Sequence, residues 1–188
     1  MQSADVIRFA AVGDIHCTKD SAGALRDLFA HASQVADALL LCGDLTDYGL
    51  AEEARVLADE LGAASVPIVA VLGNHDFESD TPGEVAQILK QAGVHVLDGE
   101  AIEIEGVGIA GTKGFVGGYG RGTSRLEEPL IRHPVTAVVH GHAHRGTPEG
   151  RTVNGTPVFN VSLPLMREAR PERPYRVVEV ETSMEVPT

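Results

Sequence analysis

Four short polar strings contain the residue types that could do chemistry in this chain of 188 residues. They are Gly13-Asp14-Ile15-His16, Gly43-Asp44, Gly73-Asn74-His75-Asp76 and His140-Gly141-His142-Ala143-His144. Their carboxylate, amide and imidazole groups form the mixed set of ligands that binds divalent transition metals. These groups are more than one tetrahedral ion needs. A shared carboxylate can hold two cations ~3.5–4 Å apart, so the strings favour a two-metal site.

Each string follows an apolar run of the length of a β-strand. Such runs recur along the chain, and most are near-continuous rather than alternating, as is typical of strands covered on both faces. We therefore expect strands at Val6–Val12, Ala38–Cys42, Pro67–Leu72, Val94–Leu97, Val107–Ala110, Thr136–Val139, Pro157–Val161 and Tyr175–Val180.

Helical patterns separate the early strands. Ala22–Val35 and Leu50–Leu61 each place apolar residues on one face, and Gly62 follows the second of them as a C-cap. The sequence Thr81-Pro82-Gly83-Glu84 is typical of a helix start, with Thr81 as the N-cap. That helix should run to Ala92.

The order of these elements predicts an α/β fold. The first half reads β-α-β-α-β-α, and the second half is mostly strands, with turns at Glu105-Gly106 and Asn154-Gly155. In open α/β sheets ligands bind outside the carboxyl ends of the strands, and the four strings are expected there.

Composition excludes several other classes of function. The hydrophobic fraction of 43% is that of a globular chain, and we expect one domain over residues 1–188. A formal charge of −12 repels phosphate backbones and argues against non-specific nucleic-acid binding. No apolar run reaches the ~18 residues of a membrane span. The N-terminus Met-Gln-Ser-Ala-Asp lacks the basic region of a secretory signal, so we expect a cytoplasmic protein.

The four strings, in this order, resemble the motifs of the calcineurin-like metallophosphoesterase family. The matching motifs are Asp14-x-His16, Gly43-Asp44, Gly73-Asn74-His75-Asp76 and Gly141-His142-x-His144, and the resemblance extends to Asn160-Val161-Ser162-Leu163. It implies a four-layer α/β/β/α sandwich of mixed sheets. It also implies a hydrolase in which water activated by a dinuclear metal centre cleaves a small phosphate mono- or diester. The implied cofactors are two divalent ions, drawn from Mn, Fe, Zn and Ni.

The resemblance also implies a role for each residue. Asp14, His16 and His144 would hold the first metal, and Asp44 would bridge the two metals. Asn74 and His142 would hold the second metal. His75 would not be a ligand but would face the leaving group, and Asp76 would orient its ring.

The chain departs from the family pattern in one respect. The family has one more metal-binding histidine, on its own strand between the Gly-Asn-His and Gly-His-x-His motifs. A helix and a strand are missing here between about Gly122 and Leu126, either from the chain itself or through a segment omitted near residues 120–126. His133 and His140 are the candidates to replace this histidine. If neither does, the second metal is held less tightly than the first.

A second class of function stays open. Some relatives with eroded sites act as scaffolds for protein interactions. The complete set Asp14, His16, Asp44, Asn74, His75, His142 and His144 favours an enzyme over a scaffold.

Overall fold

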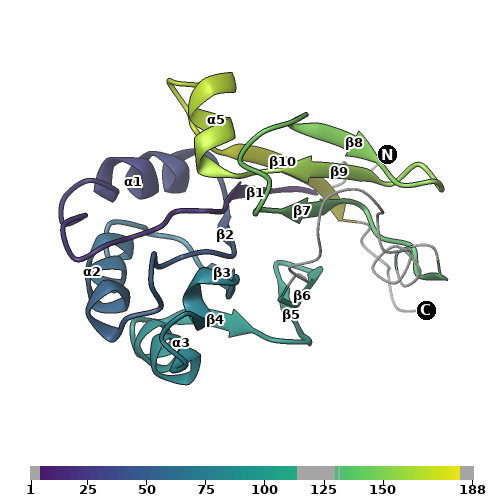
Figure 1. Cartoon of the computed structure of the whole chain (residues 1–188). Coiled ribbons are helices and arrows are strands. Elements are labelled where there is room, and N and C mark those ends of the chain that lie inside the picture. Colours follow the sequence, from purple (N-terminus) through teal and green to yellow (C-terminus); the bar gives the residue numbers. More distant parts are fainter. Residues whose placement is uncertain (1–4, 114–129, 131, 183–188) are drawn as a thin grey trace.

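The computed structural model describes residues 5–113, 130 and 132–182. Its main sheet has five strands in the order β10-β1-β2-β3-β4 (Figure 1). Strands β1 to β4 run parallel, and β10 pairs antiparallel with β1 at the edge. The carboxyl ends of β1, β2 and β3 therefore lie at the same end of the sheet. The bounds are β1 Asp5–Val12, β2 Ala38–Cys42, β3 Ile68–Val71, β4 Val94–Leu97 and β10 Arg176–Thr182.

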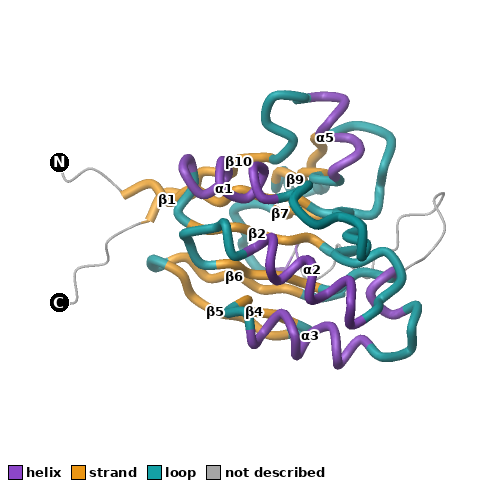
Figure 2. Tube along the Cα trace, turned by 90° about the vertical axis from the view of Figure 1, so that its left-hand side faces the viewer, coloured by secondary structure: helices purple, strands orange, loops and turns teal. Residues whose placement is uncertain are grey.

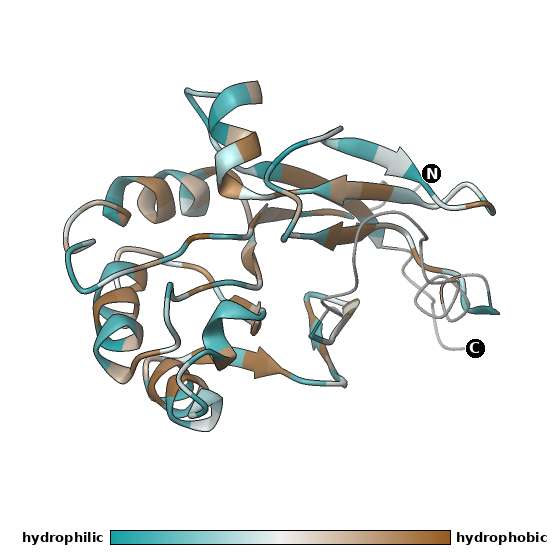
Figure 3. Ribbon diagram, viewed as in Figure 1, coloured by the Kyte–Doolittle hydropathy of each residue, from teal (hydrophilic) through white to brown (hydrophobic). Residues whose placement is uncertain are grey.

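Helices connect the parallel strands and pack on one face of this sheet (Figures 1 and 2). Leu39 and Leu41 of β2 point to this side and join Phe29 and Leu57 of the helices in one buried cluster. Ala38 faces the other side. Both faces of the strand are thus covered, as its near-continuous apolar run predicts, and Figure 3 shows the strands mostly in the apolar colour. These helices are α1 (Arg26–Val35), α2 (Ala51–Leu61) and α3 (Pro82–Gln91).

Further strands cover the opposite face of the main sheet. The hairpin of β5 (Glu100–Ile104) and β6 (Val107–Gly111) packs there, because Ile104 shares a buried cluster with Phe9 and Val69. Its turn residues Glu105 and Gly106 have φ values of 50° and 79°, as a type I′ turn requires.

A three-stranded sheet in the order β7-β9-β8 lies on the same side as this hairpin (Figure 1). Its strands are β7 (Val138–His140), β8 (Glu149–Arg151) and β9 (Pro157–Asn160), and the helix α5 (Leu163–Ala169) follows them. Residues 114–129 and 131, including the suspected gap between Gly122 and Leu126, lie outside the described residues.

All eight expected strands are present, with ends shifted by up to two residues. The structure adds β5, β8 and α5, which the sequence patterns do not predict. Strand β8 reads Glu-Gly-Arg and is exposed throughout, so it has no apolar signal and forms only by pairing with β9. None of the helices that the structure describes combines the length and the apolar character needed to cross a bilayer.

The start of α1 and the cap of α3 differ from the expectation. Helix α1 begins at Arg26 rather than at Ala22, because the preceding residues form turns whose N–H groups bind a carboxylate of α2. This carboxylate is Glu60, a buried side chain that accepts hydrogen bonds from the backbone N–H groups of Gly23, Leu25 and Arg26. Thr81 precedes α3 as expected, but its side chain makes no capping hydrogen bond.

Candidate metal centre

The fold brings the polar strings together from strands that are far apart in sequence. Asp14 follows β1, Asp44 follows β2, and His142 and His144 follow β7. Two groups of potential metal-ligating atoms result, and within each group the atoms lie within 4.8 Å of one another. One group contains Asp14, His16 and His144, and the other contains His16, Asp44 and His75.

Asp14 is the buried carboxylate of the first group, with 2% of its surface exposed. The backbone N–H of His142 donates to both of its oxygens, at 2.8 and 2.7 Å, and the Nε2 atom of His144 lies 3.1 Å from one of them. Burial raises the pKa of the Asp14 carboxyl group, although the His142 hydrogen bond and His144 lower it. A carboxylate in this position favours a cationic neighbour, because its charge has little access to water.

Two imidazole rings lie beside this carboxylate in a T-shaped, edge-on arrangement. The Nε2 atoms of His16 and His144 are 3.3 Å apart, and the ring centroids are 5.2 Å apart at an interplanar angle of 83°. Two ring nitrogens and a carboxylate oxygen thus converge on one point. This is the donor set that a divalent transition metal prefers.

Asp44 occupies the equivalent place in the second group, with 3% of its surface exposed. The backbone N–H of His75 donates to its Oδ1 at 2.9 Å, and the Nδ1 of His142 lies 4.0 Å from its Oδ2. Each buried carboxylate therefore receives a backbone N–H from a loop that carries another motif. Asp44 lies between the histidines that follow β3 and those that follow β7.

Glycine is required where the loops approach these carboxylates. A Cβ atom on Gly141 would lie 2.5 Å from an Asp14 oxygen, and a Cβ atom on Gly73 would overlap the Asp44 carboxylate. Any side chain at either position would displace the carboxylate or the loop. The two glycines are therefore part of the site geometry rather than ordinary turn residues.

The backbone of the site is left-handed at several residues with side chains. The φ values are 52° at Asp14, 48° at His16, 47° at Asp44 and 70° at His142. Such conformations are uncommon outside glycine and cost about 1 kcal/mol or more each. Their concentration at the candidate ligands indicates a functional site.

The ring of His75 is held by the main chain of another loop. Its Nδ1 lies 2.7 Å from the carbonyl oxygen of Asp47, and the carboxylate of Glu78 is 3.3 Å from the same nitrogen. Burial lowers the pKa of His75, but the Asp47 carbonyl and the carboxylates of Asp44 and Glu78 raise it by more, so that the net shift is upward.

This arrangement corrects the expectation for Asp76. Its side chain is fully buried, and both oxygens accept hydrogen bonds from backbone N–H groups of Leu45, Thr46 and Gly73, as well as from the Thr46 hydroxyl. Burial raises the pKa of Asp76, and these bonds lower it. Asp76 fastens the loop after β2 to the loop after β3. The Asp47 carbonyl, and not Asp76, orients the His75 ring.

Asp47 is a residue that the sequence motifs did not single out. Its carboxylate oxygen lies 3.1 Å from the Nδ1 of His16, while its carbonyl holds His75. A carboxylate on the far nitrogen of a metal-binding histidine fixes the ring and raises its basicity. Its position three residues after Asp44 is the only signal that the sequence offers.

The remaining candidate ligands are Asn74, His133 and His140, and the structure does not bring all of them to the two groups. Asn74 lies between Gly73 and His75, at the start of the short 3-10 helix η1 (His75–Phe77), so its backbone adjoins Asp44. His133 and His140 are exposed, and neither belongs to the two groups found among the described residues. The ligand roles of all these residues stay predictions.

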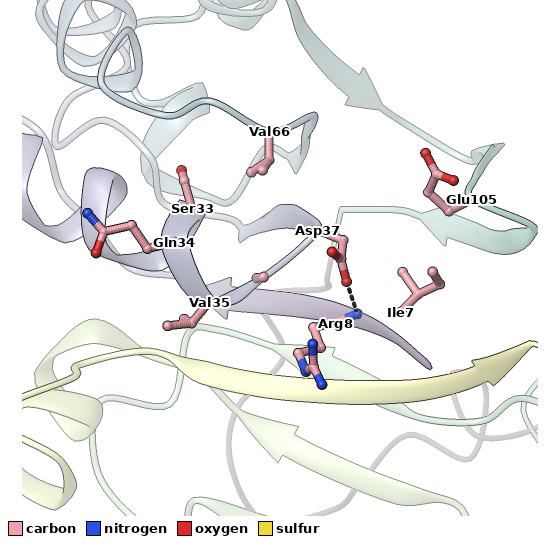
Figure 4. A pocket seen from close by; sticks show the side chains of 9 residues that line it. Ile7, Arg8, Ser33, Gln34, Val35, Asp37, Val66 and Glu105 are labelled. Carbon is pink, nitrogen blue, oxygen red and sulfur yellow. Dashed lines mark hydrogen bonds between the residues drawn. The ribbon is translucent and has the colours of Figure 1, made fainter. Parts of the chain in front are cut away.

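A hollow elsewhere on the surface contains none of the candidate residues. Ile7, Arg8, the last turn of α1 and Asp37 line it, and the Asp37 carboxylate accepts the backbone N–H of Arg8 at 2.8 Å (Figure 4). These residues precede or begin β2 and lie early in β1. The hollow is therefore at the end of the sheet opposite the metal-ligating groups.

Nitrogen and oxygen donors gathered at the carboxyl ends of parallel strands are typical of metal-binding proteins with an α/β fold. The calcineurin-like phosphoesterase family matches residues 7–146, and the chain belongs to this family. No curated protein sequence matches the chain at a significant level.

Solved structures share the fold of this chain. The protein TT1561 of Thermus thermophilus is 12% identical with a TM-score of 0.62, and the match covers 94% of this chain and 99% of that one. A conserved uncharacterized protein of Streptococcus pneumoniae, described as a predicted phosphoesterase, is 17% identical with a TM-score of 0.54. That match covers 95% of this chain and 86% of the other. The chain thus has the metallophosphoesterase fold that its motifs predict.

Proposed function

We propose that this chain hydrolyses a small phosphate mono- or diester with the help of two divalent cations. The observation that carries the proposal is the pair of buried carboxylates, Asp14 and Asp44, each bound by a backbone N–H and surrounded by histidine nitrogens. Family membership supports hydrolysis of phosphoric esters as the reaction.

The residues present fit the two cations. Asp14, His16 and His144 would hold the first, with Asp44 shared between both, and Asn74 and His142 would complete the second. The buried charge of Asp14 and the facing ring nitrogens of His16 and His144 are the donors that Mn, Fe, Zn or Ni would take. When bound, such ions supply Lewis acidity and lower the pKa of water towards neutrality.

Side chains and main-chain groups of the protein would orient the His75 ring and supply a proton to the leaving group. Because the Nδ1 of His75 faces the Asp47 carbonyl, its Nε2 is the atom available to a substrate. We assign that atom to the oxygen of the leaving group, where it would donate a proton or a hydrogen bond. Asp47 would fix the relative positions of the two rings, since its carboxylate contacts His16 and its main-chain carbonyl contacts His75.

The two cation sites should differ in strength. Neither His133 nor His140 adds a nitrogen to the groups formed by the described residues. With the ligands that the motifs imply, the second cation would have Asp44, Asn74 and His142, and the His142 side chain is 49% exposed. Fewer ligands and more exposure give a weaker hold, so we propose a tight first site and a looser second site.

A panel of chromogenic esters on the metal-free and reconstituted protein tests this function. Chelation should abolish hydrolysis of bis-p-nitrophenyl phosphate or p-nitrophenyl phosphate, and added Mn²⁺ should restore it. Full activity after dialysis against a chelator would overturn the proposal. Mn²⁺ binding without hydrolysis of any ester in the panel would favour the scaffold class instead.

A further inference from the structure

We infer that Asn160 is a positioning residue that presets the loop carrying His142 and His144, and thereby sets the affinity for the first cation. The inference rests on the proposed metal site. Asn160 is the last residue of β9 and has 4% of its surface exposed.

The Asn160 amide makes two bonds of fixed direction. Its Nδ2 donates to the carbonyl oxygen of Ala143 at 2.7 Å, and its Oδ1 accepts the backbone N–H of Ser162 at 3.2 Å. The N–H of Ser162 can only be accepted by the oxygen, and the Ala143 carbonyl can only be bound by the nitrogen. Both partners therefore give the amide the same orientation.

The bond to Ala143 acts on the peptide between the two candidate ligands. Ala143 separates His142 from His144, and His142 already has a left-handed backbone with φ of 70°. The side chains of His142 and His144 are 49% and 46% exposed, so much of this loop borders solvent. A buried amide on the carbonyl between them is a fixed point for an otherwise exposed loop.

The backbone around Asn160 holds both ends of the same loop. His140 pairs with Asn160 in the parallel register of β7 and β9, and the N–H of Val161 donates to the His140 carbonyl at 2.8 Å. The N–H of Asn160 donates to the Pro148 carbonyl at 3.0 Å. The strand thus fixes the loop at its start and at its end, and the Asn160 side chain fixes it in the middle.

The same segment also contacts the loop of Asp14. The N–H of Gly13 donates to the Val161 carbonyl at 2.8 Å, and the N–H of Leu163 donates to the Gly13 carbonyl at 2.8 Å. Residues 160–163 therefore contact both the loop that supplies Asp14 and the loop that supplies His144. This places Asn160 where it can set the separation between the two.

The expected effect is on metal affinity more than on folding. His144 lies 3.1 Å from Asp14 and 3.3 Å from His16, so a shift of about 1 Å in its loop would remove it from the shared point. Loss of a partner that orients a ligand typically weakens metal binding about 10- to 100-fold.

The test compares Mn²⁺ binding by calorimetry, and by electron paramagnetic resonance, in the wild type, Asn160→Asp and Asn160→Ala. Asn160→Asp keeps the acceptor for Ser162 but places an oxygen against the Ala143 carbonyl. We expect the dissociation constant of the tight site to rise about 10- to 100-fold in both variants. Asn154→Asp is the matched control: it removes an amide that donates to the Leu130 carbonyl, away from the loop, and should leave the constant unchanged.

The outcomes separate the inference from the proposed function. A wild type that binds no Mn²⁺ contradicts the metal site itself. A wild type that binds Mn²⁺, together with variants that melt at lower temperature but bind it equally well, assigns Asn160 a purely structural role and overturns the inference. Failure of both variants to fold overturns it as well, because Asn160 would then serve the fold alone.

Discussion

The Nδ1 atom of His75 lies 2.7 Å from the carbonyl oxygen of Asp47, while the Asp47 carboxylate lies 3.1 Å from His16. One residue therefore contacts a candidate metal ligand through its side chain and the candidate proton donor through its main chain. A substitution at Asp47 can remove the contact with His16 and keep the contact with His75, because a change of side chain leaves the main-chain carbonyl in place.

The substitution Asp47→Ala should weaken metal binding without misplacing His75. It removes the carboxylate partner of His16 and keeps the carbonyl that binds His75. We expect about a 10- to 100-fold rise in the Mn²⁺ dissociation constant, and near-normal turnover once Mn²⁺ is saturating. Titration calorimetry followed by kinetics at high Mn²⁺ checks both parts. A turnover that stays low at saturation would show that the Asp47 side chain also acts on His75.

The substitution His75→Ala should give the opposite result. The proposed set of metal ligands does not include His75, so Mn²⁺ binding should persist, while turnover should fall about 10²- to 10⁴-fold. The fall should be smaller for nitrophenyl esters than for alkyl esters, because nitrophenolate needs little protonation to leave. Rates for a series of leaving groups measure this. Equal losses across the series would assign His75 a role in binding phosphate or in structure.

The substitution Asp44→Asn should reduce bound metal rather than only the rate. It removes the charge that the two proposed cation sites would share, and it also relieves repulsion with Asp14, whose pKa the Asp44 charge helps to raise. We expect the wild type to melt at higher temperature when Mn²⁺ is added. Asp44→Asn should melt at or above the wild-type temperature without metal and gain less from Mn²⁺. A thermal scan of both proteins with and without Mn²⁺ decides, and equal gains would contradict the shared position.

The substitution Asp76→Ala should destabilise the fold. Asp76 is fully buried and accepts three backbone N–H groups and a hydroxyl, all of which would lose their partner. Leaving buried donors unpaired costs about 1–3 kcal/mol for each group, so we expect a loss of at least about 3 kcal/mol in the free energy of unfolding. Urea unfolding of the metal-free protein measures it. A loss below about 1 kcal/mol would show that the two loops hold together without this carboxylate.

The substitution Glu60→Gln should make stability less dependent on acid pH. The pKa of Glu60 lies below its ordinary value of 4.5; burial raises it, but the N–H groups of Gly23, Leu25 and Arg26 lower it by more. A lowered carboxyl pKa adds stability above pH 4.5, and this stability is lost as pH falls through the folded-state pKa. At pH 7 the variant should lose about 1 kcal/mol, the usual value of a helix cap.

The loss caused by Glu60→Gln should shrink as the pH falls below 4.5, which urea unfolding at several pH values would follow. Glu84→Gln is the control, because the Glu84 side chain is exposed and pairs with the equally exposed Arg55, and it should change stability by less than about 0.5 kcal/mol. A difference between Glu60→Gln and wild type that stays constant down to about pH 3 would contradict the capping role.

Much of this site follows from the sequence, because the carboxyl ends of parallel strands must meet. Asp14, Asp44 and His75 each follow an apolar run, and the structure places them at one end of the main sheet. The partner of His75 does not follow from the sequence, because a main-chain carbonyl such as that of Asp47 is present at every residue and leaves no motif. Asp76 adjoins His75 in sequence, but the tight 3-10 turn there directs consecutive side chains about 120° apart. The Asp76 carboxylate consequently faces the interior.

The left-handed backbone at Asp14, His16, Asp44 and His142 has a consequence for descent. Glycine would adopt these four conformations without steric cost, so a protein selected for its fold alone would gain stability by exchanging them for glycine. Aspartate and histidine at these positions carry a conformational cost that the proposed binding of metal would offset. We therefore expect homologues with glycine at these positions to have lost metal binding and to be more stable.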